Sequence, residues 1–381
     1  MQEQGGDEPF WAFYPAPLPP HPSLAIDARM QDALDRANQA LGRLDGVTLR
    51  IPHPDVFLYS FVRKEAVLSS QIEGTQSSLS ELLLFELDGA PGAPLHDAEE
   101  TSSYVRAINH GMRRLEEGFP LSLRLMREVH AELLLGGRGG ALDRGEFRRT
   151  QNWVGGSRPG NARFVPPPAR EVPDAMRALE RFIHDEPTRT PVLLKAALAH
   201  AQIETIHPFH DGNGRVGRLL ITLILCNEKV LARPLLYLSL YLKRHRSAYY
   251  DHLQRIRVDG AWEPWVNFFL DGVIEVAEST TEATRRIVEL FETDRARIGS
   301  ELGTRSSTAL RLHELLCQKV VLSVPEAARE LAISEPTAYS GIDALERIGV
   351  AREGTGRKRN RLFVYDRYLS IVSEGTDSPP G

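Results

Sequence analysis

The sequence predicts a mainly α-helical protein that ends in a small winged helix-turn-helix domain. Apolar residues recur at three- and four-residue spacings in most segments between Ala25 and Arg295, as in helices that bury one face. Strand character interrupts this pattern in one Gly- and Pro-rich segment, residues 145–168. After about residue 306 a second unit begins, with short helices that carry capping residues at their starts.

The length of the chain sets the number of domains. A chain of 381 residues is long enough for two or three domains with separate cores. We expect an N-terminal arm and helix region over residues 1–95 and a helical core over residues 96–295. A linker over residues 296–306 and the winged-helix domain, residues 306–372, follow.

Composition and charge exclude several classes of protein. A net charge of −5 argues against a chain that coats nucleic acid over its whole surface, although a local basic patch is compatible with it. Cys226 and Cys317 lie far apart in apolar surroundings, and the N-terminus lacks the features of a signal peptide. The apolar run LLITLILC from Leu219 is far shorter than the roughly 18 residues of a membrane span. We therefore expect a cytoplasmic protein without disulfides or membrane helices.

The N-terminal region begins as an arm and continues as helices. Residues 11–23, WAFYPAPLPPHPS, predict an extended segment that lies on a surface, because proline disfavours helix. Residues 61–72, FVRKEAVLSSQI, predict an amphipathic helix, with Gly74 as its stop. The residues at helical spacing are Phe61, Val62, Glu65, Leu68, Ser69 and Ile72.

Two later segments predict β structure. Residues 145–168, GEFRRTQNWVGGSRPGNARFVPPP, contain two short extended runs around a Gly-rich turn, which predicts a β-hairpin that projects from the helices. In the C-terminal unit, Ser323 with Glu326 forms a capping box and Ser334 starts a second helix. The tail from residue 350 to 366 then predicts the two-stranded wing of a winged helix.

The most informative segment is HPFHDGNGRVGR, residues 207–218. Its glycines satisfy G-x-G-x-x-G, but a dinucleotide-binding fold needs a buried strand before the first glycine, and the preceding residues are helical. No P-loop sequence occurs either. Gly212, Asn213 and Gly214 directly precede a helix, so their backbone N–H groups can form a cradle for an anion at its N-terminus.

The charged residues around this cradle suit a phosphate ligand. Arg215 and Arg218 share a face of the first helical turn and can bind phosphate oxygens. Asp211 is placed to hold a Mg²⁺ that bridges the phosphates, and His207 is the candidate general base. His207 and His210 could instead be a pair of metal ligands, although for His210 we favour a structural role.

This segment resembles the Fic family motif, H-x-F-x-[DE]-G-N-G-R-x-x-R, at every defined position. The resemblance implies transfer of a nucleotide monophosphate, usually AMP from ATP, to a Ser, Thr or Tyr hydroxyl of a protein. It implies that His207 deprotonates the target hydroxyl, Phe209 packs into the core and Asp211 holds Mg²⁺. It assigns Arg218 to the γ-phosphate. The residues that it assigns to the α- and β-phosphates are Gly212, Asn213, Gly214 and Arg215.

The resemblance extends to other segments. Residues 145–168 are similar to the family's flap, a hairpin that pairs with an extended target segment and aims its hydroxyl. SAYYDHLQRI follows the motif where the family builds its adenine pocket, which implies that Tyr250, rather than Tyr249, packs on the base. Two aromatic residues at this spacing are also common in a core. The proline-rich arm and the winged-helix tail are arranged as in many bacterial Fic proteins.

SSQIEGT, residues 69–75, resembles the family's inhibitory pattern, [ST]-x-x-x-E-[GN], at Ser69, Glu73 and Gly74. Ser69 and Glu73 lie one helical turn apart on one face. A Glu73 carboxylate on Arg218 would remove the group that holds the γ-phosphate, and misplaced substrate can cost on the order of 100-fold in rate. The pattern therefore predicts intramolecular inhibition. In some family members the same glutamate supports removal of AMP, and the sequence leaves this reverse activity open.

The second hypothesis is a DNA-binding regulator that uses the Fic core as a nucleotide sensor. The wing carries a basic cluster that suits phosphate contacts, Arg352, Arg357, Lys358, Arg359 and Arg361. The helix after Ser334 carries Glu335, Asp343 and Glu346, a poor surface for reading bases, so dimerisation or target docking has equal weight. A third hypothesis keeps the fold but transfers another phosphate-linked group. The candidate partners are thus ATP, a target protein, DNA and a second copy of the chain.

Overall fold

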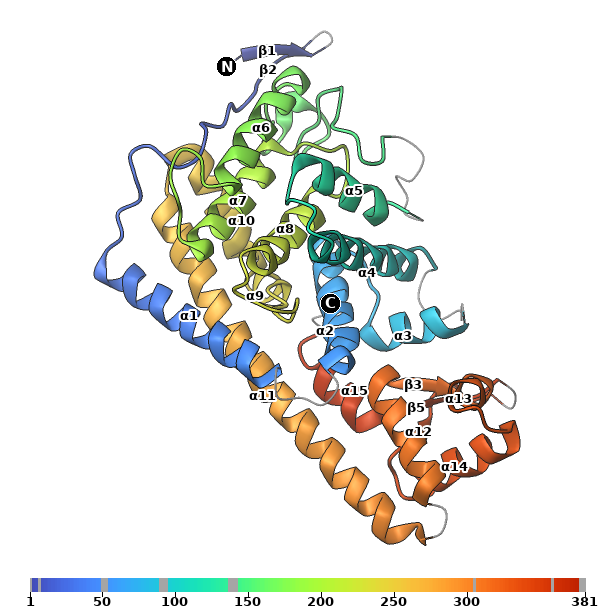
Figure 1. The fold of residues 1–381 in the computed structure, drawn as a ribbon. Helices are drawn as coiled ribbons and strands as arrows, with labels where there is room; N and C mark the ends of the chain where they lie inside the picture. Colours follow the sequence, from blue (N-terminus) through green and yellow to red (C-terminus); the bar gives the residue numbers. More distant parts are fainter. Residues whose placement is uncertain are drawn as a thin grey trace.

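The computed structural model describes residues 2–5, 8–48, 54–88, 95–135, 143–303, 306–357 and 360–376. As predicted, the chain is mainly helical, and Figure 1 shows a helical body with a smaller C-terminal unit below it. The helices are α1 (Ala28–Thr48), α2 (Pro54–Ile72), α3 (Leu79–Asp88), α4 (Leu95–Glu116), α5 (Leu123–Leu133), α6 (Val172–Ile183), α7 (Val192–Ile206), α8 (Asn213–Asn227), α9 (Ser239–Arg244), α10 (Arg246–Asp259), α11 (Trp262–Glu301), α12 (Ser306–Lys319), α13 (Val324–Leu331), α14 (Glu335–Arg347) and α15 (Asp366–Ser373). The strands are β1 (Gln2–Gly5), β2 (Glu8–Trp11), β3 (Val321–Ser323), β4 (Arg352–Glu353) and β5 (Leu362–Val364).

The centre of the core is formed by α7 and α8. Every residue of α7 from Leu193 to Ile206 is buried, and α8 is buried from Arg215 to Leu225. Both segments are rich in apolar or small residues on all sides, as expected of helices enclosed by others. Because α7 and α8 pack against each other, the loop between them is anchored at both ends in the core.

The helix α2 is amphipathic at the predicted positions. The predicted inward-facing residues are all buried, namely Phe61, Val62, Glu65, Leu68, Ser69 and Ile72. Gly74 lies just beyond the end of α2, as predicted. The helix packs against α4 and α9 of the helical body and against α12 of the C-terminal unit.

The predicted linker at residues 296–306 is wrong for its first part. α11 continues without a break to Glu301 and lies alongside α1 (Figure 1). Ile298 is fully buried, and the Arg297 guanidinium donates a hydrogen bond of 2.7 Å to the carbonyl of Ile348 in the C-terminal unit. Contacts distant in sequence therefore stabilise a helix end whose local pattern is weak.

The N-terminal arm lies on the flap, residues 145–168. Residues 12–27 contain no helix or strand, which fits the predicted extended segment, but β1 and β2 before them pair as an antiparallel hairpin. The amide of Phe13 donates to the carbonyl of Val165 at 2.9 Å. Phe10 and Ala12 are buried together with Val165, so apolar contact holds the arm in place.

The flap has less strand pairing than the predicted β-hairpin. Val154 and Phe164 form one antiparallel bridge, with amide-to-carbonyl distances of 2.8 and 3.1 Å. A 3₁₀ turn, Pro159–Asn161, lies between them, and no further ladder forms within the flap. Its glycines and prolines explain this, because they weaken or block regular strand pairing.

The C-terminal unit has the element order predicted for a winged helix. Its sheet is antiparallel, with β5 between β3 and β4. The hydroxyls of Ser323 and Ser334 cap α13 and α14 as predicted. The Glu326 carboxylate does not complete the capping box but pairs with Lys319 at 2.6 Å. Lys358 and Arg359 of the predicted wing lie outside the described residues.

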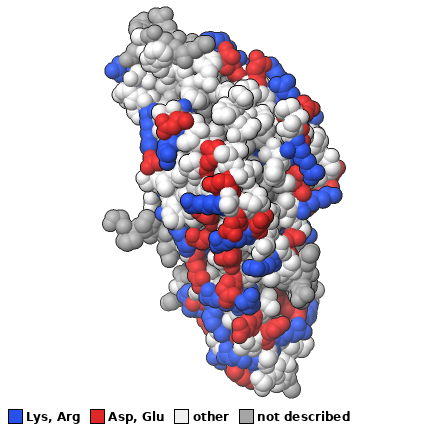
Figure 2. Space-filling model, turned by 90° about the vertical axis from the view of Figure 1, so that its left-hand side faces the viewer, with Lys and Arg blue, Asp and Glu red and all other residues white. Residues whose placement is uncertain are grey.

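Charged side chains are mixed on the face shown in Figure 2. This face includes α1 and α11, and its basic and acidic groups alternate rather than gather by sign. Among the described residues, no helix combines the length and the apolar character needed to cross a membrane.

Candidate functional site

The candidate base His207 terminates α7 in a left-handed conformation. Its φ and ψ are 51° and 59°, which few residues other than glycine adopt, and its amide still donates to the carbonyl of Ile203 at 2.8 Å. This conformation turns the chain out of α7 directly at the imidazole. Strained backbone of this kind is common at functional sites, where the surrounding structure enforces it.

The loop after His207 is fixed by Phe209, which is fully buried as expected. The His130 ring stacks on Phe209 with 3.8 Å between centroids, and His130 Nε2 lies 3.1 Å from the carbonyl oxygen of Asp211. The Asn213 side chain accepts from the Phe209 amide and donates to its carbonyl, both at 2.8 Å. Asn213 therefore braces the loop with its side chain, which leaves its backbone for a phosphate.

A polar pocket of about 290 Å³ opens at the N-terminus of α8. Gly212 is the cap of this helix and has a positive φ of 76°, which glycine adopts at little cost. The first N–H groups of a helix lack partners within the helix, so this end attracts an anion. The residues that line the pocket are Glu73, Glu100, Leu134, His207, His210, Asp211, Gly212, Asn213, Gly214 and Arg215.

Arg215 is buried at the pocket between two carboxylates. Its guanidinium contacts Glu100 and lies 3.3 Å from Asp211. Asp211 is largely exposed and accepts a hydrogen bond of 2.7 Å from the Gly212 amide. The sequence analysis did not identify Glu100, because it lies on α4, 115 positions before Arg215, and no local pattern marks it.

Arg218 is held by the segment that the sequence analysis identified as inhibitory. Its Nε donates to the Ser69 hydroxyl at 2.8 Å, and its Nη2 donates to the Ser69 carbonyl at 3.0 Å and to Glu73 Oε1 at 2.6 Å. A methyl group on Gly214 would lie 2.2 Å from Glu73 Oε1. The carboxylate therefore occupies space above the phosphate cradle that only a glycine leaves open.

Burial and charge tune the acids and bases at this site. Burial, with the nearby cations Arg257 and Arg148, lowers the pKa of His207 to about 4. Burial alone would raise the pKa of Glu73, but the Arg218 guanidinium outweighs it and lowers that pKa. His207 is thus an uncharged imidazole near neutral pH, and Glu73 is an anion paired with Arg218.

Glu204, one turn before His207, is a buried carboxyl that the sequence analysis missed. Burial raises its pKa to about 7, although Arg218 opposes the shift. Its Oε1 has no hydrogen-bond partner among the described residues. A methyl group on Gly217 would lie 2.7 Å from this oxygen, so Glu204 lies beneath the first turn of α8.

The two tyrosines proposed for the base differ in burial. Tyr249 is fully buried, and its hydroxyl lies 2.9 Å from His200 Nε2, so it belongs to the core. Tyr250 is partly exposed, its ring centroid lies 4.9 Å from that of Tyr249, and it does not line the pocket at the start of α8. His210 is partly exposed at the pocket, 3.7 Å from Asp143. Among the described residues, no group of three or more potential ligands supports the alternative of a metal site at His207 and His210.

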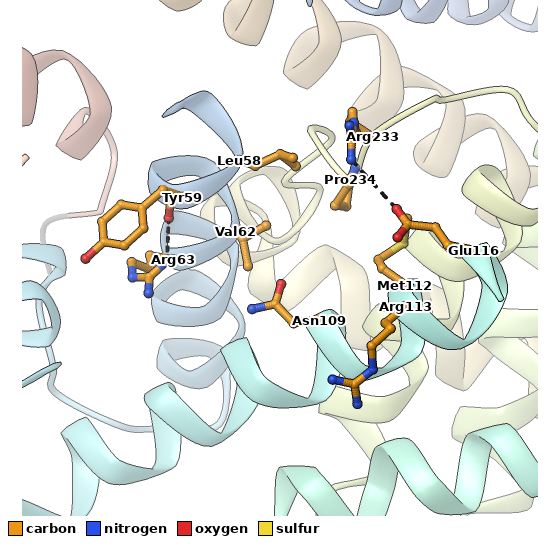
Figure 3. Close-up of a pocket in the computed structure, with 10 residues that line it drawn as sticks. All are labelled: Leu58, Tyr59, Val62, Arg63, Asn109, Met112, Arg113, Glu116, Arg233 and Pro234. Carbon is orange, nitrogen blue, oxygen red and sulfur yellow. Dashed lines mark hydrogen bonds and ion pairs between the residues drawn. The ribbon is translucent and has the colours of Figure 1, made fainter. Parts of the chain in front are cut away.

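A second pocket, of about 360 Å³, lies between α2, α4 and the loop at Pro234 (Figure 3). Arg233 lies 3.7 Å from Glu116 in this pocket, and Arg63 pairs with Glu86 at 2.6 Å. These carboxylates neutralise two of its three arginines. The lining residues are Leu58, Tyr59, Val62, Arg63, Asn109, Met112, Arg113, Glu116, Arg233 and Pro234.

The matches of this chain to known proteins agree with the motif found at the site. Residues 31–113 match the Fic/DOC family N-terminal domain, and residues 120–225 match the Fic/DOC family domain. A protein adenylyltransferase Fic from Culex quinquefasciatus is 35% identical over 251 residues, which cover 65% of this chain and 46% of the relative. The Drosophila melanogaster protein of the same name is 27% identical over 292 residues, 74% of this chain and 54% of the relative. The chain thus spans about half the length of these relatives.

Solved structures share the fold. A Fic family protein from Desulfovibrio desulfuricans has a TM-score of 0.57 at 19% identity and matches 90% of this chain and 97% of its own. A Fic domain containing signaling protein from Bacteroides thetaiotaomicron has a TM-score of 0.53 at 20% identity and matches 66% of this chain and 97% of its own. With its matches to both domains, and with His207, Asp211 and the start of α8 in one pocket, the chain belongs to the Fic/DOC family.

Proposed function

We propose that this protein is an adenylyltransferase, which transfers AMP from ATP to a Ser, Thr or Tyr hydroxyl of a target protein and is inhibited by its own Glu73. The main observation in support of this proposal is that His207, the start of α8 and Arg215 line one pocket. The names of the curated relatives support the same activity.

His207 is the general base in this proposal. Its uncharged imidazole accepts the proton of the target hydroxyl as the hydroxyl oxygen attacks the α-phosphorus of ATP. A bond forms between that oxygen and the α-phosphorus, and the bond from the α-phosphorus to the pyrophosphate breaks. The products are the AMP ester of the target and pyrophosphate.

The start of α8 holds the nucleotide. Backbone N–H groups from Gly212 to Gly214 and the Arg215 side chain bind the α- and β-phosphates, and Arg218 binds the γ-phosphate. These groups neutralise the charge that develops on the leaving pyrophosphate. Tyr250, the more exposed of the two tyrosines, is the residue that would pack on the adenine base.

Asp211 is the proposed Mg²⁺ ligand. Mg²⁺ commonly keeps several waters and takes one or two carboxylates together with substrate phosphates, so a single exposed carboxylate at the cradle suits it. The ion would supply charge neutralisation on the phosphates. Arg215, 3.3 Å from Asp211, would then bind phosphate oxygens in place of that carboxylate.

The flap is the proposed docking site for the target. Val154 and Phe164 form its bridge, and close to this bridge Asn152 Nδ2 donates to the Phe209 carbonyl of the motif at 3.0 Å. An extended target segment that pairs with the flap would present its hydroxyl to His207.

Glu73 is the proposed brake. It occupies Arg218, so the γ-phosphate loses its ligand and bound ATP lies in a position unsuited to in-line attack. The resemblance to the family also makes this carboxylate the candidate group that orients a water for the removal of AMP from modified targets.

The test is labelling with α-³²P-ATP and Mg²⁺. Wild type, Glu73→Gly, His207→Ala and the double variant Glu73→Gly/His207→Ala are incubated with ATP, and covalent label is measured on the protein itself and in a cell lysate. We expect strong label for Glu73→Gly, weak label for wild type and none for the double variant Glu73→Gly/His207→Ala. Absence of label from every variant with ATP and with the other nucleoside triphosphates would reject the transferase.

DNA binding through the wing receives less support. Arg352 pairs with Asp366 at 2.6 Å, and Arg361 lies 3.6 Å from Glu346. These carboxylates compete with DNA phosphates for the two arginines. A gel shift of the full chain with duplex DNA at several salt concentrations tests this candidate.

A further inference from the structure

Two arginines outside the nucleotide pocket connect the flap to the end of α7. Arg148 is 2% exposed and lies within the flap. Its Nε donates to the carbonyl of His207 at 2.9 Å and its Nη1 to that of Thr150 at 3.2 Å, and its Nη2 donates to the carbonyl of Pro167. One side chain thus ties both ends of the flap to the backbone of the catalytic histidine.

Arg257 makes a second connection from α10. Its Nη2 donates to the Glu204 carbonyl at 3.2 Å, and its Nε to the Thr205 hydroxyl at 3.4 Å, in the last turn before His207. The same guanidinium also contacts the flap, because its Cζ lies over the Phe164 ring, 3.8 Å from the ring centre. Phe164 is the residue that forms the bridge with Val154.

The two arginines also act on the charge of the imidazole. The charged and titratable groups that act on His207 are Arg257 on α10, Arg148 on the flap, Glu73 after α2 and Glu204 on α7. Both cations oppose protonation of the imidazole, whereas Glu73 favours it. Neither arginine lines the nucleotide pocket.

We propose that Arg148 and Arg257 are positioning residues that lock the flap against the end of α7, so that a target held by the flap meets His207 at a fixed distance. This proposal deepens the proposed function and rests on it for the target. The part of the proposal that concerns structure, namely that these arginines couple the flap to residues 204–207, does not depend on transferase activity. A shift of about 1 Å in a reacting group can cost on the order of 100-fold in rate, which gives this coupling its importance.

The first test is hydrogen exchange of the flap amides in the full chain. Arg257→Met removes the contacts to Phe164, Glu204 and Thr205, so the mutually bonded amides of Val154 and Phe164 should exchange about tenfold faster. Arg255→Met, on the exposed face of α10, is the matched control and should leave both rates unchanged. Equal exchange in Arg257→Met and wild type would overturn the proposal.

A second variant approaches the same contact from the flap. Phe164→Leu keeps an apolar side chain but removes the ring beneath Arg257, and it should also accelerate exchange of the Val154 amide. It keeps the test decisive if Arg257→Met does not fold. A rate equal to that of wild type in Phe164→Leu would show that the ring contact does not hold the flap.

The third test separates positioning from packing. In ¹⁵N-histidine NMR titrations, Arg257→Met should raise the pKa of His207, whereas Arg257→Lys, which keeps the charge, should raise it less. In the Glu73→Gly background, Arg257→Met should lower the maximal rate of self-labelling about tenfold and leave the ATP concentration for half-maximal rate unchanged. An unchanged His207 pKa in Arg257→Met would overturn the electrostatic part. Absence of labelling in every variant, with altered exchange and titration, would instead reject the transferase alone.

Discussion

The carboxylate of Glu73 lies 2.6 Å from the guanidinium of Arg218, although the two residues are 145 positions apart in the chain. This ion pair joins the segment just after α2 to the second turn of α8, next to Gly214. In this pair, the Glu73 carboxylate occupies the arginine that we assign to the γ-phosphate. The predictions below follow from it and from the packing around it.

The strength of the brake should depend on the charge at residue 73. Glu73→Gly removes the carboxylate and should raise the initial rate of AMP transfer on the order of 100-fold. Glu73→Gln keeps the shape and one hydrogen bond to Arg218 but loses the charge, so its rate should lie between those of wild type and Glu73→Gly. Initial rates of label incorporation measure this order. Equal rates for Glu73→Gln and wild type would show that charge has no part in the inhibition.

Ser69 should contribute a smaller part of the brake. Its hydroxyl accepts from Arg218 Nε at 2.8 Å inside the core. Ser69→Ala removes this acceptor but leaves the Ser69 carbonyl and Glu73, so the transfer rate should rise about tenfold at most. The neighbouring Ser70, whose hydroxyl has no partner among the described residues, supplies the control Ser70→Ala, which should match wild type. A Ser69→Ala rate above that of Glu73→Gly would reverse this ranking.

Gly214 and Glu73 should be coupled in stability. Gly214→Ala places a methyl group 2.2 Å from Glu73 Oε1, which must move and leave Arg218. The variant should lose about 1–3 kcal/mol of unfolding free energy, as for other overpacked sites. In the Glu73→Gly background the clash is absent and the loss should be smaller. Urea denaturation of the four proteins gives the coupling, and additive losses would contradict it.

Buried histidines and buried acids should give opposite pH dependences. Burial lowers the pKa of His200 to about 4, so its contribution to stability is present above about pH 6.5 and is lost as the pH falls toward 4. Burial raises the pKa of Glu204 to about 7, so its contribution is present below about pH 4.5 and is lost as the pH rises toward 7.

Two variants test these opposite signs. Between pH 4.5 and 6.5, His200→Gln should lower the slope of unfolding free energy against pH, and Glu204→Gln should raise it. The maximum for each is one proton, about 1.4 kcal/mol per pH unit. Urea denaturation across this range measures both slopes. Changes of the same sign in the two variants would refute the assignment.

Asp294 should be critical for the attachment of the C-terminal unit. It is fully buried on α11, accepts from the Tyr365 hydroxyl at 2.7 Å and pairs with Arg367 at 2.5 Å. Asp294→Ala removes this acceptor from Tyr365 and Arg367, and also from Arg297 at 3.4 Å, and should cost about 3–5 kcal/mol.

An exposed ion pair of the same unit supplies the control. Asp343 pairs with Arg347 at 3.2 Å with both side chains about half exposed, so Asp343→Ala should change stability by less than about 1 kcal/mol. Urea denaturation compares the two variants. Equal losses would show that the buried network carries no special weight.

Local patterns in the sequence predicted the local structure around the site. The glycines and charges of residues 207–218 predicted a turn between helices with an anion site, and the apolar spacing of residues 61–72 predicted the buried face of α2. Predictions failed where distant contacts outweigh local preference. The end of α11 is helical because Arg297 and Ile298 contact other segments, and the flap keeps one bridge because its glycines and prolines prevent a ladder.

The sequence by itself determined which residues we assign to the chemistry of this protein, since His207, Asp211, Arg215 and Arg218 occur in one short motif and Glu73 in another. The tertiary structure decided which groups act on that motif. Glu100 reaches Arg215 from α4, and Arg148 and Arg257 reach the end of α7 from the flap and α10. No periodicity marks these residues, because their roles arise from packing between segments far apart in the chain, whereas a sequence pattern reports only on neighbours along a helix, a strand or a turn.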